Sequence, residues 1–357
     1  LELYVHIPFC EEKCKYCDFL SFKADDGEKK AYVTQLIEEI KAQGQNYSDY
    51  LVSSIFIGGG TPTTLNGIWI LDIMNAIREN FMVETDAEVS IECNPGTLST
   101  SKIMHIKKAG VNRISFGLQS SIEEELKELG RIHTYKDFLQ SYQLAREYGF
   151  TNINVDLMSG LPKQTIDSYK TTLKRVCALK PEHISAYSLI IEPGTPFFEK
   201  YGSEEGAQLL PGENTDREMY ALTKSILKEH GYERYEISNY AKPGRECRHN
   251  IGYWTGVSYL GLGVGASGYV MNRRFHVESD YRKYMSVKMQ QDITPLYCDI
   301  EELDIKANME EFMFLGLRLT KGVSRHEFNE KFGVDMFEVF DRQIKRNMML
   351  KLMEYNS

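Results

Sequence analysis

Six short apolar runs, each followed by a stretch with helical periodicity, limit what this chain can fold into. The runs lie at 3–7, 53–57, 88–92, 112–118, 152–158 and 183–190. Apolar residues recur at helical spacing in the stretches between them, at 29–43, 67–80, 100–109, 121–129, 135–148 and 165–179. Apolar strands that alternate with amphipathic helices predict parallel strands covered by helices. Six such units predict an α/β fold with a partial (β/α)6 TIM-like barrel, because a closed barrel of this kind needs eight.

The strand–helix rhythm stops at 192–214, a segment rich in Gly, Pro and Glu. We therefore expect three parts. Residues 1–200 form the barrel, 201–300 form an α+β segment that completes or links the barrel, and 301–357 form a small helical domain. The last two parts together make up a small α+β C-terminal region of the fold.

Composition excludes some classes of protein. The 357 residues contain 42 Lys and Arg against 51 Asp and Glu, a net charge of −9. A general nucleic-acid binder needs a dominant basic surface, so we expect no nucleic-acid partner. No run approaches the roughly 20 apolar residues that span a bilayer, and the first residues do not resemble a signal peptide. The odd number of cysteines, seven, does not suggest a disulfide framework. These features predict a cytoplasmic protein.

Three cysteines, Cys10, Cys14 and Cys17, follow the first predicted strand with the spacing C-x3-C-x2-C. Three thiolates cannot complete a tetrahedral structural zinc site without a fourth ligand. They can hold three irons of a [4Fe–4S] cluster and leave the fourth iron open. The position favours the cluster, because barrel enzymes place their chemistry at the carboxyl ends of the strands. A zinc knuckle that recruits His6, or three unrelated thiols, are the alternatives.

The cysteine spacing resembles the signature of radical S-adenosylmethionine (SAM) proteins. The segments "YVHIPFC", "GGGTPT" (58–63) and "DLMSGLPKQT" (156–165) resemble the oxygen-independent coproporphyrinogen III oxidase group, along essentially the whole chain. The resemblance implies that the three cysteines ligate a [4Fe–4S] cluster and that SAM chelates its open iron. It also implies contacts with the cluster or SAM by Tyr4, Tyr16, Gly59, Gly60, Thr61, Glu92, Gln119, Arg131 and Asp156. The glycines permit close backbone approach, and we expect the amides of this segment to face SAM.

The group has two branches, and the sequence is similar to one of them. The oxidases carry a fourth cysteine where this chain has Phe19, and a long extension before the cysteine strand, which begins here at residue 3. The heme chaperone branch has "CDF" and a later H-N-x-x-Y-W motif. In "RHNIGYW" this chain has His249, Asn250, Tyr253 and Trp254. The resemblance implies a heme-binding chaperone of porphyrin and heme metabolism.

Two residues are candidates for the axial ligand of the heme iron. Histidine is a common axial ligand of heme iron, and aromatic rings offer flat apolar contact. Cys247, two residues before His249, competes with it as a ligand. The alternative gives these residues no ligand at all: His249 caps a loop and Trp254 fills the core between domains.

Two further functions remain as alternatives. The first is a radical SAM coproporphyrinogen III oxidase, which decarboxylates porphyrinogen propionates through a 5′-deoxyadenosyl radical. The second is a non-catalytic iron–sulfur or zinc protein. Whether the chain is an enzyme is therefore open, and no catalytic residue is assigned. The partners that the resemblance implies are heme and a heme-accepting protein, with a membrane-bound respiratory protein as one candidate. It leaves a homodimer open.

Overall fold

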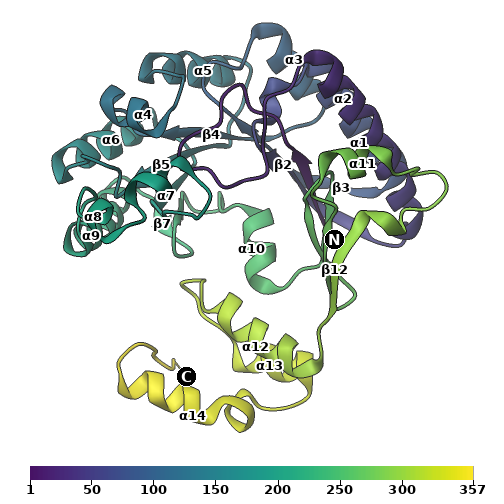
Figure 1. Ribbon diagram of the computed structural model, residues 1–357. Helices are drawn as coiled ribbons and strands as arrows, with labels where there is room; N and C mark the ends of the chain where they lie inside the picture. Colours follow the sequence, from purple (N-terminus) through teal and green to yellow (C-terminus); the bar gives the residue numbers. More distant parts are fainter. Residues whose placement is uncertain (357) are drawn as a thin grey trace.

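One curved sheet of twelve strands organises the chain, whose computed structural model describes residues 1–356 (Figure 1). The strand order is β12-β11-β10-β9-β1-β2-β3-β4-β5-β6-β8-β7. Its central six strands are parallel neighbours in chain order. They are β1 (Glu2–Ile7), β2 (Leu51–Gly59), β3 (Met82–Cys93), β4 (Arg113–Gln119), β5 (Ile153–Ser159) and β6 (His183–Ser188). The sheet has two free ends, β12 and β7, so the predicted partial barrel of six strand–helix units is confirmed.

Helices cover the outer side of these strands (Figure 1). They are α1 (Asp26–Asn46), α2 (Gly67–Asn80), α3 (Thr100–Lys108), α4 (Glu123–Leu129), α5 (Tyr135–Glu147) and α6 (Ile166–Leu179), with a short 3-10 helix η1 (Pro62–Thr64) before α2. Side chains with oxygen acceptors start most of them. Asp25 and Thr165, for example, cap α1 and α6 in capping boxes, which satisfy backbone N–H groups that have no partner within the helix.

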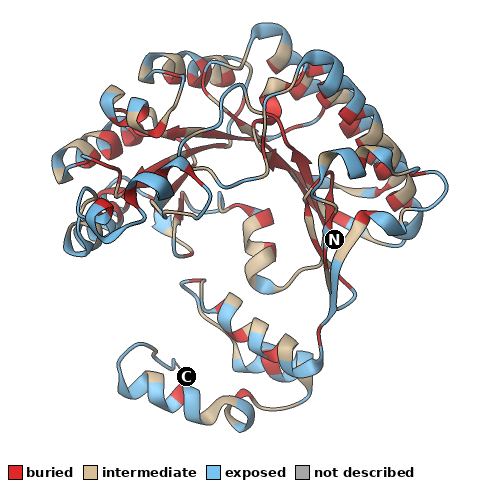
Figure 2. Cartoon of the chain, in the orientation of Figure 1, coloured by how far each residue is buried: buried red, intermediate tan, exposed pale blue. Residues whose placement is uncertain are grey.

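Buried residues lie along the central strands and on the sheet-facing sides of the helices (Figure 2). In β1, Leu3, Val5 and Ile7 are fully buried, and in β5 Ile153, Val155 and Leu157 are also fully buried. The residues between them face the inside of the partial barrel. Because an apolar core fills the space between sheet and helices, the polar residues of these strands are left for the inner face.

The remaining strands extend the same sheet at both ends. Parallel pairing joins β9 to β1, whereas the other additional strands pair antiparallel. They are β7 (Glu233–Arg234), β8 (Asn239–Ala241), β9 (Tyr259–Leu262), β10 (Ser267–Val270), β11 (Arg273–Val277) and β12 (Tyr297–Glu302). The segment predicted to complete or link the barrel thus adds its strands to the barrel sheet and builds no separate sheet.

Helices of the second half lie between and beyond these strands. They are α7 (Pro196–Tyr201), α8 (Glu204–Ala207), α9 (Glu213–Glu229), α10 (Arg248–Thr255), α11 (Tyr281–Ser286) and the 3-10 helix η2 (Thr294–Leu296). Three more, α12 (Ile305–Gly316), α13 (Arg325–Phe332) and α14 (Met336–Met349), pack around a small core of their own that includes Met309, Phe328 and Ile344. Figure 1 shows α10 between the sheet and this C-terminal group of helices.

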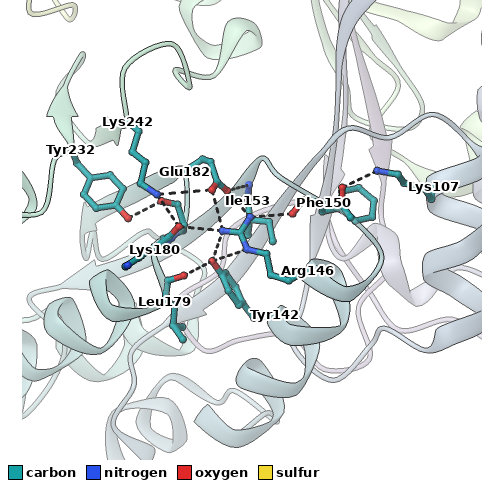
Figure 3. A network of polar contacts seen from close by, with 12 residues as sticks. Lys107, Tyr142, Arg146, Phe150, Ile153, Leu179, Lys180, Glu182, Tyr232 and Lys242 are labelled. Atoms are coloured by element: carbon teal, nitrogen blue, oxygen red, sulfur yellow. Dashed lines mark hydrogen bonds and ion pairs between the residues drawn. The ribbon is translucent and has the colours of Figure 1, made fainter.

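A polar network fastens the helices to the amino ends of β5 and β6 (Figure 3). The guanidinium of Arg146, near the end of α5, donates to both carboxylate oxygens of Glu182, at 2.8 and 3.2 Å. Glu182 also accepts from the backbone N–H of Ile153, and Arg146 donates to the carbonyl oxygen of Phe150. This network lies at the edge of the sheet opposite to the cysteine loop, so it stabilises the barrel without touching the predicted site.

Candidate functional site

The three cysteines lie in the loop that connects β1 to α1, at the carboxyl end of the first strand. Pairing between Phe9 and Phe22 closes the base of this loop. Its middle is held from two sides, because the backbone N–H of Lys15 donates to Leu129 and its carbonyl accepts from Phe197. All three cysteines are free and partly exposed. The loop therefore presents thiols at a fixed place on the rim of the barrel.

The surroundings of the thiols fit a cluster. Arg131 donates to Cys14 Sγ at 3.4 Å, and Cys10 Sγ lies 3.6 Å from Thr61 Oγ1. Burial raises the pKa of Cys17, and the neighbouring thiols of Cys14 and Cys10 raise it further. Within residues 1–356, no group of three His, Cys, Asp or Glu side chains is arranged around a single metal ion. A [4Fe–4S] cluster makes no such demand, because each thiolate binds a different iron.

Arg131 and Thr61 belong to a small pocket beside the cysteine loop. Arg131 donates to Asn94 Oδ1 at 3.1 Å and to the carbonyl oxygen of Gly117, and Asn94 donates to Thr61 Oγ1 at 2.9 Å. The Arg131 Nε is buried without a hydrogen-bond partner among the described residues. A positive charge held against a thiol stabilises the thiolate, which is the form that binds iron.

The "GGGT" segment turns sharply where β2 ends. Close contacts within the protein explain why glycine is needed there. Gly59 has a φ of 113°, and a Cβ there would collide with the ring of His6. A Cβ on Gly60 would meet the backbone of Phe9. The N–H groups of Gly59, Gly60 and Thr61 donate to Glu92 Oε2, the Ile7 carbonyl and the Phe9 carbonyl. The expectation that these amides face SAM is therefore not met, because all three are engaged within the protein.

Two carboxyl groups lie at the inner end of a large cavity in the mouth of the barrel. Glu92 accepts from the backbone N–H of Gly59 at 3.1 Å, and burial, with the nearby Asp156, raises its pKa to about 8. Asp156 accepts from Asn154 Nδ2 and Ser115 Oγ at 2.8 and 3.1 Å, and burial raises its pKa as well. A cationic ligand would stabilise the charged form of both groups.

The cavity has a volume of about 630 Å³. Residues predicted to contact SAM and residues predicted to contact heme both line it. Its inner end is polar, with Glu92, Asp156 and Tyr4. Its outer end is formed by α10 and the C-terminal helices and is lined by rings and aliphatic side chains, namely Tyr253, Trp254, Tyr259, Tyr269, Phe312 and Leu315. A volume of this size suits a cofactor-sized molecule. Eight predicted residues line this single cavity: Tyr4, Gly59, Glu92, Asp156, His249, Asn250, Tyr253 and Trp254.

His249 lies in the wall of the cavity with both ring nitrogens in use. Its Nδ1 is 2.8 Å from Ser54 Oγ, and its Nε2 is 2.9 Å from the hydroxyl of Tyr253. Only 1% of its surface is exposed, and its ring stacks on Phe56. Burial lowers the pKa of His249 to about 3, so the ring is neutral near pH 7. Ligation of heme iron by His249 requires the contact with Tyr253 to open.

Cys247 is less suited to bind heme iron. Its side chain is fully buried and lies outside the lining of the cavity, with Sγ 3.3 Å from Glu88 Oε1. Burial raises its pKa to about 12, so the thiol keeps its proton.

Five predicted residues lie outside the lining of the large cavity: Thr61 and Arg131 line the small pocket, and Tyr16, Gly60 and Gln119 line neither. Tyr16 packs in a small apolar cluster with Phe197 and Leu129, behind the cysteine loop. Gln119 ends β4 with a φ of 70°, a left-handed conformation that non-glycine residues seldom adopt. Strained conformations of this kind gather at functional sites, and Gln119 lies next to Gly117 and thereby to Arg131.

Several lining residues were missed by the sequence analysis. Arg113 and Asn154 line the inner end, and Arg274 and Lys331 line the outer end. The strand residues could have been found by taking the polar positions that interrupt the apolar runs. Nothing in the local sequence singles out Lys331, because α13 reaches the cavity only through the packing of the C-terminal helices.

A partial barrel with three loop cysteines and a polar carboxyl-end cavity defines a radical SAM protein, and comparisons with known proteins agree. Residues 4–176 match the radical SAM superfamily, and residues 303–354 match the HemN C-terminal domain. The structure superposes on coproporphyrinogen III oxidase (HemN) from Escherichia coli with a TM-score of 0.84. The two are 26% identical, and the match covers 98% of this chain and 82% of that one.

Two relatives indicate which family within the radical SAM superfamily the chain belongs to. The chain is 38% identical over 343 residues to heme chaperone HemW of Bacillus subtilis, covering 96% of this chain and 89% of the relative. It is 36% identical over 353 residues to heme chaperone HemW of Lactococcus lactis, covering 99% and 90%. The chain belongs to the HemW family within the radical SAM superfamily. In residues 1–356, no helix is both long and apolar enough to cross a membrane.

Proposed function

We propose that this protein is a heme chaperone, which binds heme at the outer end of the cavity for delivery to another protein. The observation that carries the proposal is the continuity of the cavity: the aromatic residues of the H-N-x-x-Y-W motif share it with Glu92 and Asp156. The relatives named as heme chaperones support it. Phe19, which replaces the fourth cysteine of the oxidases, is exposed and lines the same cavity.

Cys10, Cys14 and Cys17 would hold a [4Fe–4S] cluster in the proposed site, and SAM would lie between this cluster and the two inner carboxyl groups. When bound, the cluster supplies one-electron reduction at its open iron. The residues of the chain position these groups. Arg131 donates to Cys14, Thr61 contacts Cys10, and the carboxyl groups of Glu92 and Asp156 would attract the positively charged part of SAM.

Trp254 and Tyr253 would supply the flat apolar contact for a porphyrin, with Asn250 at the same wall. His249 remains the proposed axial ligand, and ligation would break its hydrogen bond with the Tyr253 hydroxyl. The acceptor would be a heme protein, and a membrane-bound respiratory protein is a candidate. All seven cysteines are free, which suits a protein that works in the reducing cytoplasm.

Hemin titration tests the chaperone function. We expect about one hemin per chain, with a Soret band that differs from that of free hemin. Trp254→Ala should weaken binding about tenfold, because a buried aromatic contact is lost. The matched control is Trp69→Ala, since Trp69 lies on α2 and outside the lining of the cavity. A wild-type protein that leaves the hemin spectrum unchanged contradicts the proposal.

A second candidate, coproporphyrinogen III oxidase activity, is favoured by the superposition on the E. coli enzyme. Anaerobic incubation with reductant, SAM and coproporphyrinogen III separates the two functions. A chaperone leaves the porphyrinogen unchanged, whereas an oxidase yields protoporphyrinogen IX. Conversion by the wild-type protein, together with an unchanged hemin spectrum, would rank the oxidase first.

A further inference from the structure

The outer end of the cavity carries a positive charge that no side chain within residues 1–356 neutralises. Lys331, on α13, lines the cavity next to Phe312. Its Nζ lies 5.8 Å from the centre of the Phe312 ring and 5.6 Å from that of Phe332. Among residues 1–356, neither an ion pair nor a side-chain hydrogen bond includes this ammonium group, although Lys345 of the neighbouring helix is paired with Asp341.

The other cation at the outer end of the lining is already paired. Arg274, on β11, forms an ion pair of 2.7 Å with Glu311, and both side chains line the cavity. A third cation, Arg318, lies 4.2 Å above the ring of Trp254 and takes part in none of the ion pairs of the described chain. The outer end thus has an excess of positive charge around aromatic side chains, whereas the inner end has the carboxyl groups of Glu92 and Asp156.

Lys331 also lies close to the end of α10. Its Nζ is 3.4 Å from the position that a Cβ on Gly256 would occupy, and Gly256 ends the helix that carries Tyr253 and Trp254. A cation near a helix C-terminus is stabilising by itself. That role is structural and needs no ligand, so it has to be separated experimentally from a role in binding.

The chemistry of a tetrapyrrole matches this distribution of charge. Heme is a flat apolar ring that carries two carboxylate side chains at one edge. Rings in the wall of the cavity would contact its faces, and a free ammonium group at the rim would bind a carboxylate through a charge-assisted hydrogen bond. Within residues 1–356, no carboxylate lies within ion-pair distance of Lys331, and Arg318 over the ring of Trp254 adds to the positive charge near this end of the cavity.

We propose that Lys331 anchors a carboxylate side chain of the tetrapyrrole, so that α13 and the C-terminal helices form part of the cargo site. This inference rests on the proposed function. The anchor also sets the orientation of the tetrapyrrole in the cavity. Its carboxylate edge points toward the C-terminal helices, and the opposite edge points toward the barrel and Glu92. Release of the cargo then requires the contact with α13 to break.

Paired ligands test the anchor. Hemin and hemin dimethyl ester share the ring and the iron, but the ester has no carboxylate. Affinity is measured by quenching of tryptophan fluorescence for the wild type and for Lys331→Met, which keeps an apolar stem of similar length. We expect Lys331→Met to weaken hemin binding about fivefold to tenfold and to leave the ester unchanged. Lys331→Arg should restore most of the affinity for hemin, and the control Lys345→Met should change neither ligand.

The outcomes separate this inference from the function on which it rests. Equal losses for hemin and ester in Lys331→Met, together with a lower melting temperature, mean that Lys331 only stabilises the end of α10, and they overturn the anchor. Unchanged hemin affinity in Lys331→Met overturns it as well. If the wild type binds neither ligand, the proposed function itself fails, whatever the variant does.

Discussion

Burial opposes ionisation of the Glu92 carboxyl group, and we expect this to make the affinity for SAM depend on pH. Its pKa is raised to about 8, so the group is mostly protonated at pH 7 in the free protein. A cationic ligand selects the ionised form. The apparent affinity for SAM should therefore rise with pH up to about 8 and level off above it.

Glu92→Gln tests this effect, because glutamine still accepts from the Gly59 N–H but carries no charge. A hydrogen bond between charged groups is worth roughly 1.5–3 kcal/mol, so SAM affinity at pH 8.5 should fall about tenfold to a hundredfold. Its dependence on pH should become weaker. Calorimetric titration at several pH values measures both, with Glu147→Gln on the outer helix α5 as control. Equal pH profiles for Glu92→Gln and the wild type would place the positively charged part of SAM elsewhere.

Cys14 differs from the buried cysteines in its surroundings, although the side chains are identical. It is partly exposed and lies beside Arg131, whereas Cys93 is buried and its pKa is raised to about 11 by burial. Cys14→Ala should therefore lose the iron and the broad visible absorption, and Cys93→Ala should keep both. Iron and sulfide analysis after anaerobic purification measures this. Full iron content in Cys14→Ala would remove Cys14 from the cluster.

At the scale of elements, one ion pair joins α5 to the start of β6. Arg146 and Glu182 have side-chain exposures of 29% and 15%, and their pair is surrounded by further hydrogen bonds (Figure 3). Arg217 and Glu213 form a similar pair on α9 with exposures of 72% and 78%. Because water screens exposed pairs, the two contacts should differ in their effect on stability.

Arg146→Met should lower the free energy of unfolding by roughly 1–3 kcal/mol, since the shielded Glu182 carboxylate loses two hydrogen bonds from the guanidinium and keeps only the more distant Lys242, at 3.9 Å, as a cationic partner. Arg217→Met should change it by less than about 0.5 kcal/mol. Urea denaturation of the two variants gives the comparison. Iron content should be normal in both, because Arg146 lies at the amino ends of the strands and the side chain of Arg217 is exposed on α9. Equal stability of the two variants would show that the network in Figure 3 contributes little.

For the whole molecule, buried titratable groups set the dependence of stability on pH. Burial raises the pKa of Glu2 and Glu92 to about 8 and of Glu39 to about 7. The folded state thus binds more protons than the unfolded state between about pH 4.5 and 8, and stability falls as pH rises through this window. Buried histidines act in the opposite direction below about pH 6.5, because burial lowers their pKa, as for His133, His183 and His249.

The two effects oppose each other below about pH 6.5, and only the carboxyl groups act above it. We therefore expect the free energy of unfolding to fall by roughly 3–5 kcal/mol from pH 6.5 to 8.5. Urea midpoints across this range measure the fall, and Glu2→Gln combined with Glu92→Gln should flatten the curve. Rising stability toward pH 8.5 would contradict the prediction.

Local patterns along the chain were enough to predict the elements of the barrel and the position of the cysteines. Alternation of apolar runs and helical periodicity is a local property, since each strand and helix buries its own apolar face. It predicted all six parallel strands. The spacing of Cys10, Cys14 and Cys17 is equally local, because one loop carries them. The H-N-x-x-Y-W motif lies entirely within the short helix α10, so its residues were found together.

Which distant residues share a site, and which polar atoms are free, depends on how the elements pack in the folded chain. Packing of the C-terminal helices against α10 brings Lys331 to Trp254 and Phe312, which no local pattern predicts. Burial between β2 and α10 gives His249 two protein partners, Ser54 and Tyr253. For the same reason, the backbone N–H groups of the "GGGT" segment donate to carbonyl and carboxyl oxygens of the chain itself. A buried N–H or ring nitrogen must find a partner, and which partner it finds depends on elements that meet only in the folded chain.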